Sequence, residues 1–178
     1  AMAIVREGAP ILPSGMFYPR GLIELYLMAF SVSLFGESEW AFRLPSAVAR
    51  AALIIVAWFV GKRFLRPYWN LAFVAIIALL PEIVEFSQTA RMYVFMLLSV
   101  ALCMLCIFKW EETHLTGCLA GGVAALIAGI ELHTLAVTSV LIFLFPGLLR
   151  GDVRKIALGG IAATLCLAAV LGVDGWGT

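Results

Sequence analysis

Charged and hydroxyl side chains gather in one short segment, Pro81–Tyr93, which joins two apolar runs. Within it, Ser87 and Arg91 are four residues apart, so on one helix they would share a face. If a helix begins near Ser87 or Thr89, its free N–H groups would join Arg91 in binding an anion. A guanidinium can bond a phosphate or diphosphate through two N–H groups. The segment therefore predicts either a phosphate site or a contact with lipid headgroups.

Two further arginines stand close to the start of apolar runs. Arg20 comes two residues after Tyr18, and Arg43 comes two residues before Pro45. We expect Pro45 at a helix start, where the fixed φ and the missing N–H of proline are tolerated. Three arginines that precede helices on one side of a membrane would together bind a polyanionic headgroup. We assign this role to Arg20, Arg43 and Arg91.

Glu131 and His133 lie between two later apolar runs. They fit a metal pair, an acid–base pair, a substrate contact or a polar cap between helices. A catalytic zinc usually has three protein ligands, whereas this pair supplies two. We therefore assign no metal ligand and no certain cofactor, and a divalent metal stays open. The four cysteines have no histidine at a metal-ligand spacing, and we expect them to pack as small apolar side chains.

Composition narrows the class of protein. Of 178 residues, 63% are hydrophobic and 13% are charged, and the mean hydropathy is +1.07. Soluble domains contain about 45–50% apolar and about 25% charged residues. The net charge is +1, from 12 Lys and Arg against 11 Asp and Glu. These values exclude a soluble globular domain, a disordered chain and a nucleic-acid binder with a basic face, and they leave an integral membrane protein.

Membrane helices must position these side chains. A run over 21–36 would reach about 24 Å as a helix, short of the ~30 Å hydrocarbon core, and it contains Glu24. We therefore expect an all-α, polytopic transmembrane helical bundle with a short interfacial or re-entrant helix over 21–36. About six spans are predicted, over 44–61, 68–86, 93–109, 115–131, 134–149 and 156–173.

Basic residues sort the loops into two faces. Seven of the twelve fall in loops reached by every second crossing, namely Lys62, Arg63, Arg66, Lys109, Arg150, Arg154 and Lys155. Positive charge marks the cytoplasmic face, so Arg43, Arg91, Glu131 and His133 are expected outside, on a plasma membrane of the bacterial inner-membrane type. We expect an extracytoplasmic loop and interfacial helix over 1–43 and a transmembrane domain over 44–178, as part of a longer chain.

Three stretches carry a resemblance to a known family. They are Ser14–Tyr26, Leu34–Ser46 with its LFG-x-SE-x-A-x-RLPS pattern, and Phe86–Tyr93 with its S-x-x-AR-x-Y pattern. In order and spacing they resemble the GT-C membrane glycosyltransferases of the dolichyl-phosphate-mannose protein mannosyltransferase type. That group includes bacterial transferases of lipid A and of the lipopolysaccharide core. The cytoplasmic Gly61–Phe64 also fits, and the resemblance covers about residues 1–150.

The resemblance implies transfer of a sugar from a polyprenyl-phosphate carrier to a lipid, glycan or protein acceptor outside the membrane. The family's catalytic Asp is then expected before residue 1, and Arg20 matches a basic residue that contacts the carrier phosphate. Some relatives have an acidic metal ligand just before that residue, where this chain has Pro19. The expected partners are the sugar donor and membrane lipids. The expected substrate-binding residues are Tyr18, Arg20, Arg43, Ser87, Arg91, Tyr93, Glu131 and His133.

Two other functions fit a hydrophobic chain of this length. A non-catalytic transmembrane subunit or scaffold of a larger assembly needs no catalytic Asp, and its partners would be other membrane proteins. A small transporter would show an inverted repeat or charges at the membrane midplane, and the sequence shows neither. The glycosyltransferase, or a fragment of one, is therefore the leading hypothesis, and the scaffold is the alternative.

Overall fold

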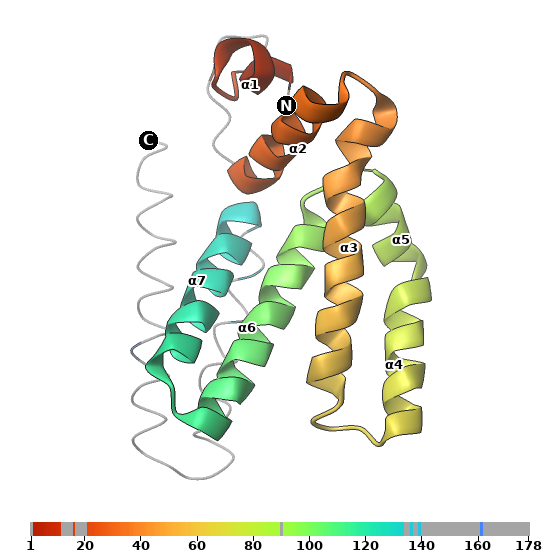
Figure 1. Ribbon diagram of the computed structural model, residues 1–178, viewed down its shortest axis with the longest axis vertical. Coiled ribbons are helices and arrows are strands. Elements are labelled where there is room, and N and C mark those ends of the chain that lie inside the picture. The colour runs from red at the N-terminus through yellow and green to blue at the C-terminus, as the bar shows by residue number, and fades with distance from the viewer. Residues whose placement is uncertain are drawn as a thin grey trace. The chain divides into compact units, whose positions relative to one another are not determined.

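The computed structural model describes residues 2–11, 16, 21–89, 91–133, 136, 139 and 161. Every secondary-structure element among them is a helix, which confirms the all-α class for this part of the chain (Figure 1). Four predictions lie outside the described residues: the spans over 134–149 and 156–173, and the sites Tyr18 and Arg20. In chain order the helices are α1 (Met2–Glu7), α2 (Leu22–Phe35), α3 (Glu39–Gly61), α4 (Pro67–Leu79), α5 (Pro81–Gln88), α6 (Tyr93–Thr113) and α7 (Thr116–Leu132).

The chain forms two compact units. The first contains Ala1–Leu98 together with Glu131–His133, and the second contains Ser99–Ile130 and Thr134–Thr178. The first unit therefore holds α1 to α5, the start of α6 and the last residues of α7. The division predicted from the sequence, at residue 43, stays a prediction.

Helix length corrects the predicted number of spans. Two helices, α3 and α6, are long and apolar enough to cross a membrane, and a third span is added if α4 and α5 count as one bent span. The expected runs 44–61 and 93–109 lie in α3 and α6. The run 68–86 is broken between α4 and α5, and α7 has only 17 residues. The described residues thus contain two or three candidate spans, fewer than the six predicted.

The short helix α2 has the predicted place and length. Its 14 residues reach about 21 Å, too little to cross a hydrocarbon core of ~30 Å. It begins after Gly21, whose φ of 63° is the left-handed conformation that glycine adopts without strain. Gly36, with a φ of 83°, ends it.

Pro45 lies inside α3 and not at its start, which corrects the prediction. The helix begins earlier, at Glu39, after the extended residue Ser38. Because proline has no N–H, the carbonyl of Ala41 four residues before it loses its helical donor. The buried Ser31 of α2 donates its hydroxyl to that carbonyl at 2.6 Å. This bond satisfies the free carbonyl and joins α2 to α3.

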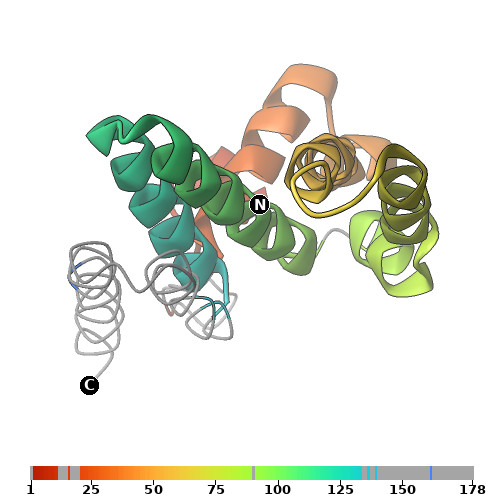
Figure 2. The same ribbon diagram turned by 90° about the horizontal axis from the view of Figure 1, so that it is seen from below.

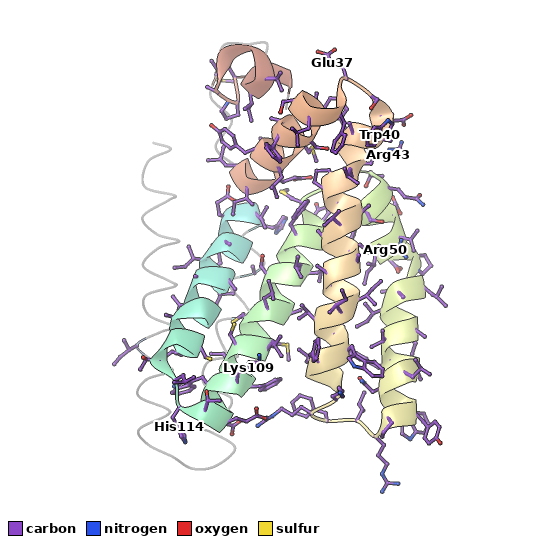
Figure 3. The ribbon with its side chains drawn as sticks, in the orientation of Figure 1. Glu37, Trp40, Arg43, Arg50, Lys109 and His114 are labelled. Carbon is purple, nitrogen blue, oxygen red and sulfur yellow. The ribbon has the colours of Figure 1, made fainter. Side chains whose placement is uncertain are left out.

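A second proline separates two helices. Pro81 begins α5 just after α4 ends at Leu79, and the two axes bend by 46°. Arg50 of α3, labelled in Figure 3, donates from its guanidinium to the carbonyl of Ala78. That carbonyl belongs to the last turn of α4, where helix carbonyls lack a helical donor. Arg50 therefore replaces a donor that the bend removes.

The turn between α3 and α4 depends on a close contact. Asn70 of α4 is 1% exposed, and its amide donates to the carbonyl of Trp58 at 3.2 Å. A Cβ at Gly61 would lie 2.0 Å from Oδ1 of Asn70, so only glycine fits there. The contact holds α3 and α4 side by side, as both ribbon views show (Figures 1 and 2).

In the second unit, glycines let α6 and α7 approach each other. A Cβ at Gly121 would lie 3.5 Å from Sγ of Cys106, and one at Gly122 would lie 3.3 Å from Ile107. Small residues at such positions allow the backbones of membrane helices to pack closely. His114, with a φ of 54°, turns the chain between the two helices.

Candidate functional site

Two glutamates lie near the amino end of α2. The backbone N–H of Leu22 donates to Oε1 of Glu131 at 2.6 Å, although 109 residues separate them in sequence. Glu24 lies in the first turn of the same helix, and its Oε2 lies 3.7 Å from the position that a Cβ on Gly21 would take. The first N–H groups of a helix have no helical acceptor, so the Glu131 carboxylate supplies one for α2.

Both carboxyl groups are incompletely satisfied. Glu24 is only 6% exposed, and its Oε1 is buried without a hydrogen-bond partner. Oε2 of Glu131 is also buried without a partner. Burial raises the pKa of Glu24 to about 7, and the nearby Glu131 carboxylate adds to the rise. The first unit thus contains two acidic side chains, each with one oxygen that lacks a hydrogen-bond partner. They are close enough for the charge of one to raise the pKa of the other.

Three rings of the first unit form a row. The ring of Tyr93 lies 4.8 Å from that of Phe86 and 5.4 Å from that of His133, measured between centroids. Both contacts are tilted, by 41° and 47°, as is usual for aromatic pairs. The structure therefore brings together two of the predicted site residues, Tyr93 at the start of α6 and His133 just after α7.

The prediction that Ser87 and Arg91 share one helix face is wrong. The helix α5 ends at Gln88, and α6 begins only at Tyr93. The hydroxyl and the N–H of Thr89 both turn back to one carbonyl in the last turn of α5, at 2.9 and 2.8 Å. These two hydrogen bonds to one carbonyl end α5, so no helix amino terminus forms near Ser87.

Ser87 and Arg91 consequently have different surroundings. Ser87 is buried, and its hydroxyl donates to the carbonyl of Val84 at 2.7 Å within its own helix. Arg91 is exposed in the connection between α5 and α6. Its guanidinium is accessible to a ligand, whereas the serine hydroxyl is already used by the backbone.

Arg43 lies near the start of α3, at the same end of the helix as Trp40 (Figure 3). Its guanidinium forms an ion pair with Glu39, one helical turn earlier. Both side chains are exposed, by 49% and 79%, so the pair is open to water and to competing anions. Tyr18 and Arg20, the other predicted residues before α2, lie outside the described residues.

The described residues contain no group of three His, Cys, Asp or Glu side chains placed to hold a metal ion. Among them, Cys103, Cys106 and Cys118 are free thiols. Glu24 and Glu131 form a group of two carboxylates, and two carboxylates completed by water are a known way to hold Mg²⁺.

Sequence reasoning missed Glu24 as a site residue. It used this glutamate only as an argument against a span over 21–36. The missed signal is one acidic residue in an otherwise apolar helix that is too short to cross a membrane. Charged groups in such places are expensive and often functional. Its partner, Glu131, comes from the far end of the described chain and is found only in three dimensions.

Comparison with known proteins gives one match. The sequence model of the family described as dolichyl-phosphate-mannose-protein mannosyltransferase matches residues 20–176. No curated protein and no solved structure matches the chain. The matched range includes the helices α2 to α7 and both glutamates.

Proposed function

The chain belongs to the dolichyl-phosphate-mannose-protein mannosyltransferase family, a family of GT-C membrane glycosyltransferases, and we propose that it takes a sugar from a polyprenyl-phosphate carrier. The acceptor is a lipid, a glycan or a protein on the extracytoplasmic side of a bacterial inner membrane. The observation that carries this proposal is the family match over residues 20–176. The apolar helices α3 and α6 are long enough to anchor such an enzyme in the bilayer.

The reaction is an inverting displacement at the anomeric carbon, with the polyprenyl phosphate as leaving group. A carboxylate accepts the proton of the acceptor hydroxyl. Negative charge grows on the leaving phosphate, and fixed guanidinium groups stabilise it. We assign this second role to Arg20 and Arg91 first, and to Arg43 as the next candidate.

The exposure of Arg91 supports its assignment. Its side chain lies between α5 and α6, two residues before Tyr93, which contacts His133. A phosphate bound by Arg91 would place the sugar or the first prenyl unit beside an aromatic row, where rings offer flat apolar surface with polar tips. Arg43 differs, because Glu39 already neutralises part of its charge.

The test is sugar transfer by the full-length protein in liposomes. The first donor is polyprenyl-phosphate mannose labelled in the sugar, followed by the corresponding glucose and galactose donors. Arg91→Ala should lower turnover about 100-fold, the usual effect of removing one group that stabilises developing charge. Arg66→Ala is the matched control, because Arg66 is an exposed arginine at the other end of α3 and α4.

Two results would overturn the proposal. Equal turnover of Arg91→Ala and Arg66→Ala at equal protein level would remove Arg91 from the site. Failure of the wild-type protein to bind or use any of the three donors would reject the transferase and favour the non-catalytic membrane subunit.

A further inference from the structure

We propose that Glu24 and Glu131 are the two protein ligands of a divalent cation of the Mg²⁺ class, bound at the amino end of α2. The proposal concerns the two carboxylates alone and does not depend on which sugar is transferred. Water molecules, or a phosphate of a bound substrate, complete the coordination shell, as is usual for Mg²⁺ in proteins.

Two buried oxygens point to a positively charged ligand. Oε1 of Glu24 and Oε2 of Glu131 are both buried and both lack a hydrogen-bond partner. The Glu24 side chain is more than nine-tenths buried, with 6% exposed. An ionised carboxylate only accepts hydrogen bonds, and a buried charge without a partner is strongly unfavourable. A bound cation satisfies both oxygens at once.

No basic side chain takes that place among the described residues. Neither glutamate forms an ion pair with a lysine or arginine there, whereas the exposed Glu39 pairs with Arg43. The two carboxylates instead act on each other, since Glu131 is the second cause of the raised pKa of Glu24. Two like charges that share a site need a proton or a cation between them.

The hydrogen bond from Leu22 favours the cation. It holds Oε1 of Glu131 at 2.6 Å and so fixes the carboxylate with its second oxygen free. Carboxylate ligands of metals are commonly oriented by such outer hydrogen bonds. The two proposed protein donors are carboxylate oxygens, which suit Mg²⁺, Ca²⁺ or Mn²⁺ better than softer metals.

Mn²⁺ is the probe, because its electron paramagnetic resonance signal reports binding directly. The purified full-length protein in nanodiscs is titrated with Mn²⁺ alone, without sugar donor, after removal of metals with EDTA. We expect one Mn²⁺ site per chain, weakened tenfold or more in both Glu24→Gln and Glu131→Gln. Mg²⁺ in excess should displace the bound Mn²⁺.

Glu82→Gln is the matched control, since it removes the same charge from an exposed glutamate on α5. Its Mn²⁺ affinity should equal that of the wild type. Glutamine at 131 still offers an oxygen to the N–H of Leu22, and glutamine at 24 resembles the neutral acid, so both variants should fold. Melting temperatures in EDTA within a few degrees of the wild type check this.

Two outcomes would overturn the proposal. The first is absence of Mn²⁺ binding in the wild type, and the second is equal binding in the wild type and the Glu24→Gln variant. In either case the pair holds only a proton. Because the titration uses no sugar donor, its failure is separate from a failure of transfer, and either result can occur alone.

Discussion

Two regions of the first unit treat polar groups in opposite ways. On the buried side of α2, Glu24 is 6% exposed and Ser31 is 5% exposed. Where α2 turns into α3, Ser33, Glu39 and Arg43 are exposed and satisfied by partners within one helical turn. The buried groups instead interact with residues of other helices. Ser31 donates a hydrogen bond to α3, and Glu24 interacts electrostatically with Glu131 of α7.

The comparison shows that a buried polar group affects the free energy of folding more than an exposed one does. An exposed ion pair exchanges freely with water and contributes about 0–1 kcal/mol. A buried polar group without a partner costs about 1–3 kcal/mol, and a buried charge costs more. The buried side of α2 therefore depends on its partners, and the exposed turn does not.

The largest expected effect is the pH dependence that Glu24 causes. Its pKa rises from 4.5 to about 7 on folding, so the folded protein binds the proton more tightly than the unfolded chain does. The associated stability is fully present below about pH 4.5, and it falls as the pH rises through 7, by about 3 kcal/mol in total. Denaturation of the wild type in mild detergent with EDTA, from pH 4 to pH 8.5, measures this loss.

Glu24→Gln is the comparison for that experiment, because glutamine cannot ionise. Subtracting its pH profile from that of the wild type isolates the contribution of Glu24. Parallel profiles for the two proteins would contradict a buried, proton-binding Glu24.

A smaller effect is expected from the buried serine. Ser31→Ala leaves the Ala41 carbonyl without its donor, because Pro45 cannot supply one, and we expect a loss of about 2 kcal/mol. Ser33→Ala is the control on the same helix. Its hydroxyl bonds an exposed carbonyl of its own helix, so its loss should stay within about 0.5 kcal/mol. Equal losses for the two serines would mean that the Ala41 carbonyl is satisfied in another way.

The smallest effect belongs to the exposed ion pair. A double-mutant cycle with Glu39→Ala and Arg43→Ala should give a coupling energy of about 0.5 kcal/mol. Salt should reduce it, since both side chains are open to solvent. A coupling above about 2 kcal/mol, or one that salt leaves unchanged, would contradict the contrast between the two regions.

Helix existence was more predictable than helix boundaries. The spans over 44–61 and 93–109 and the short helix over 21–36 follow from apolar length alone, and the structure contains all three as α3, α6 and α2. Pro45 and Pro81 behave differently although both follow a leucine. Pro45 remains inside a helix because Ser31 satisfies the freed carbonyl, whereas the chain bends at Pro81. No local rule distinguishes these two cases, because the deciding partner comes from another helix.

By itself the sequence determined the membrane class, the all-α class and the family, since these depend on composition, apolar run length and residue spacing along the chain. It also singled out Tyr93, Glu131 and His133 as residues of interest. Only the tertiary structure decided that Ser87 and Arg91 belong to different elements and that Glu131 meets Leu22 and lies close to Glu24. The physical reason is that burial and hydrogen bonding join groups more than a hundred residues apart. Whether a glutamate is an ordinary surface charge or a buried acid with a pKa near 7 depends on those distant neighbours.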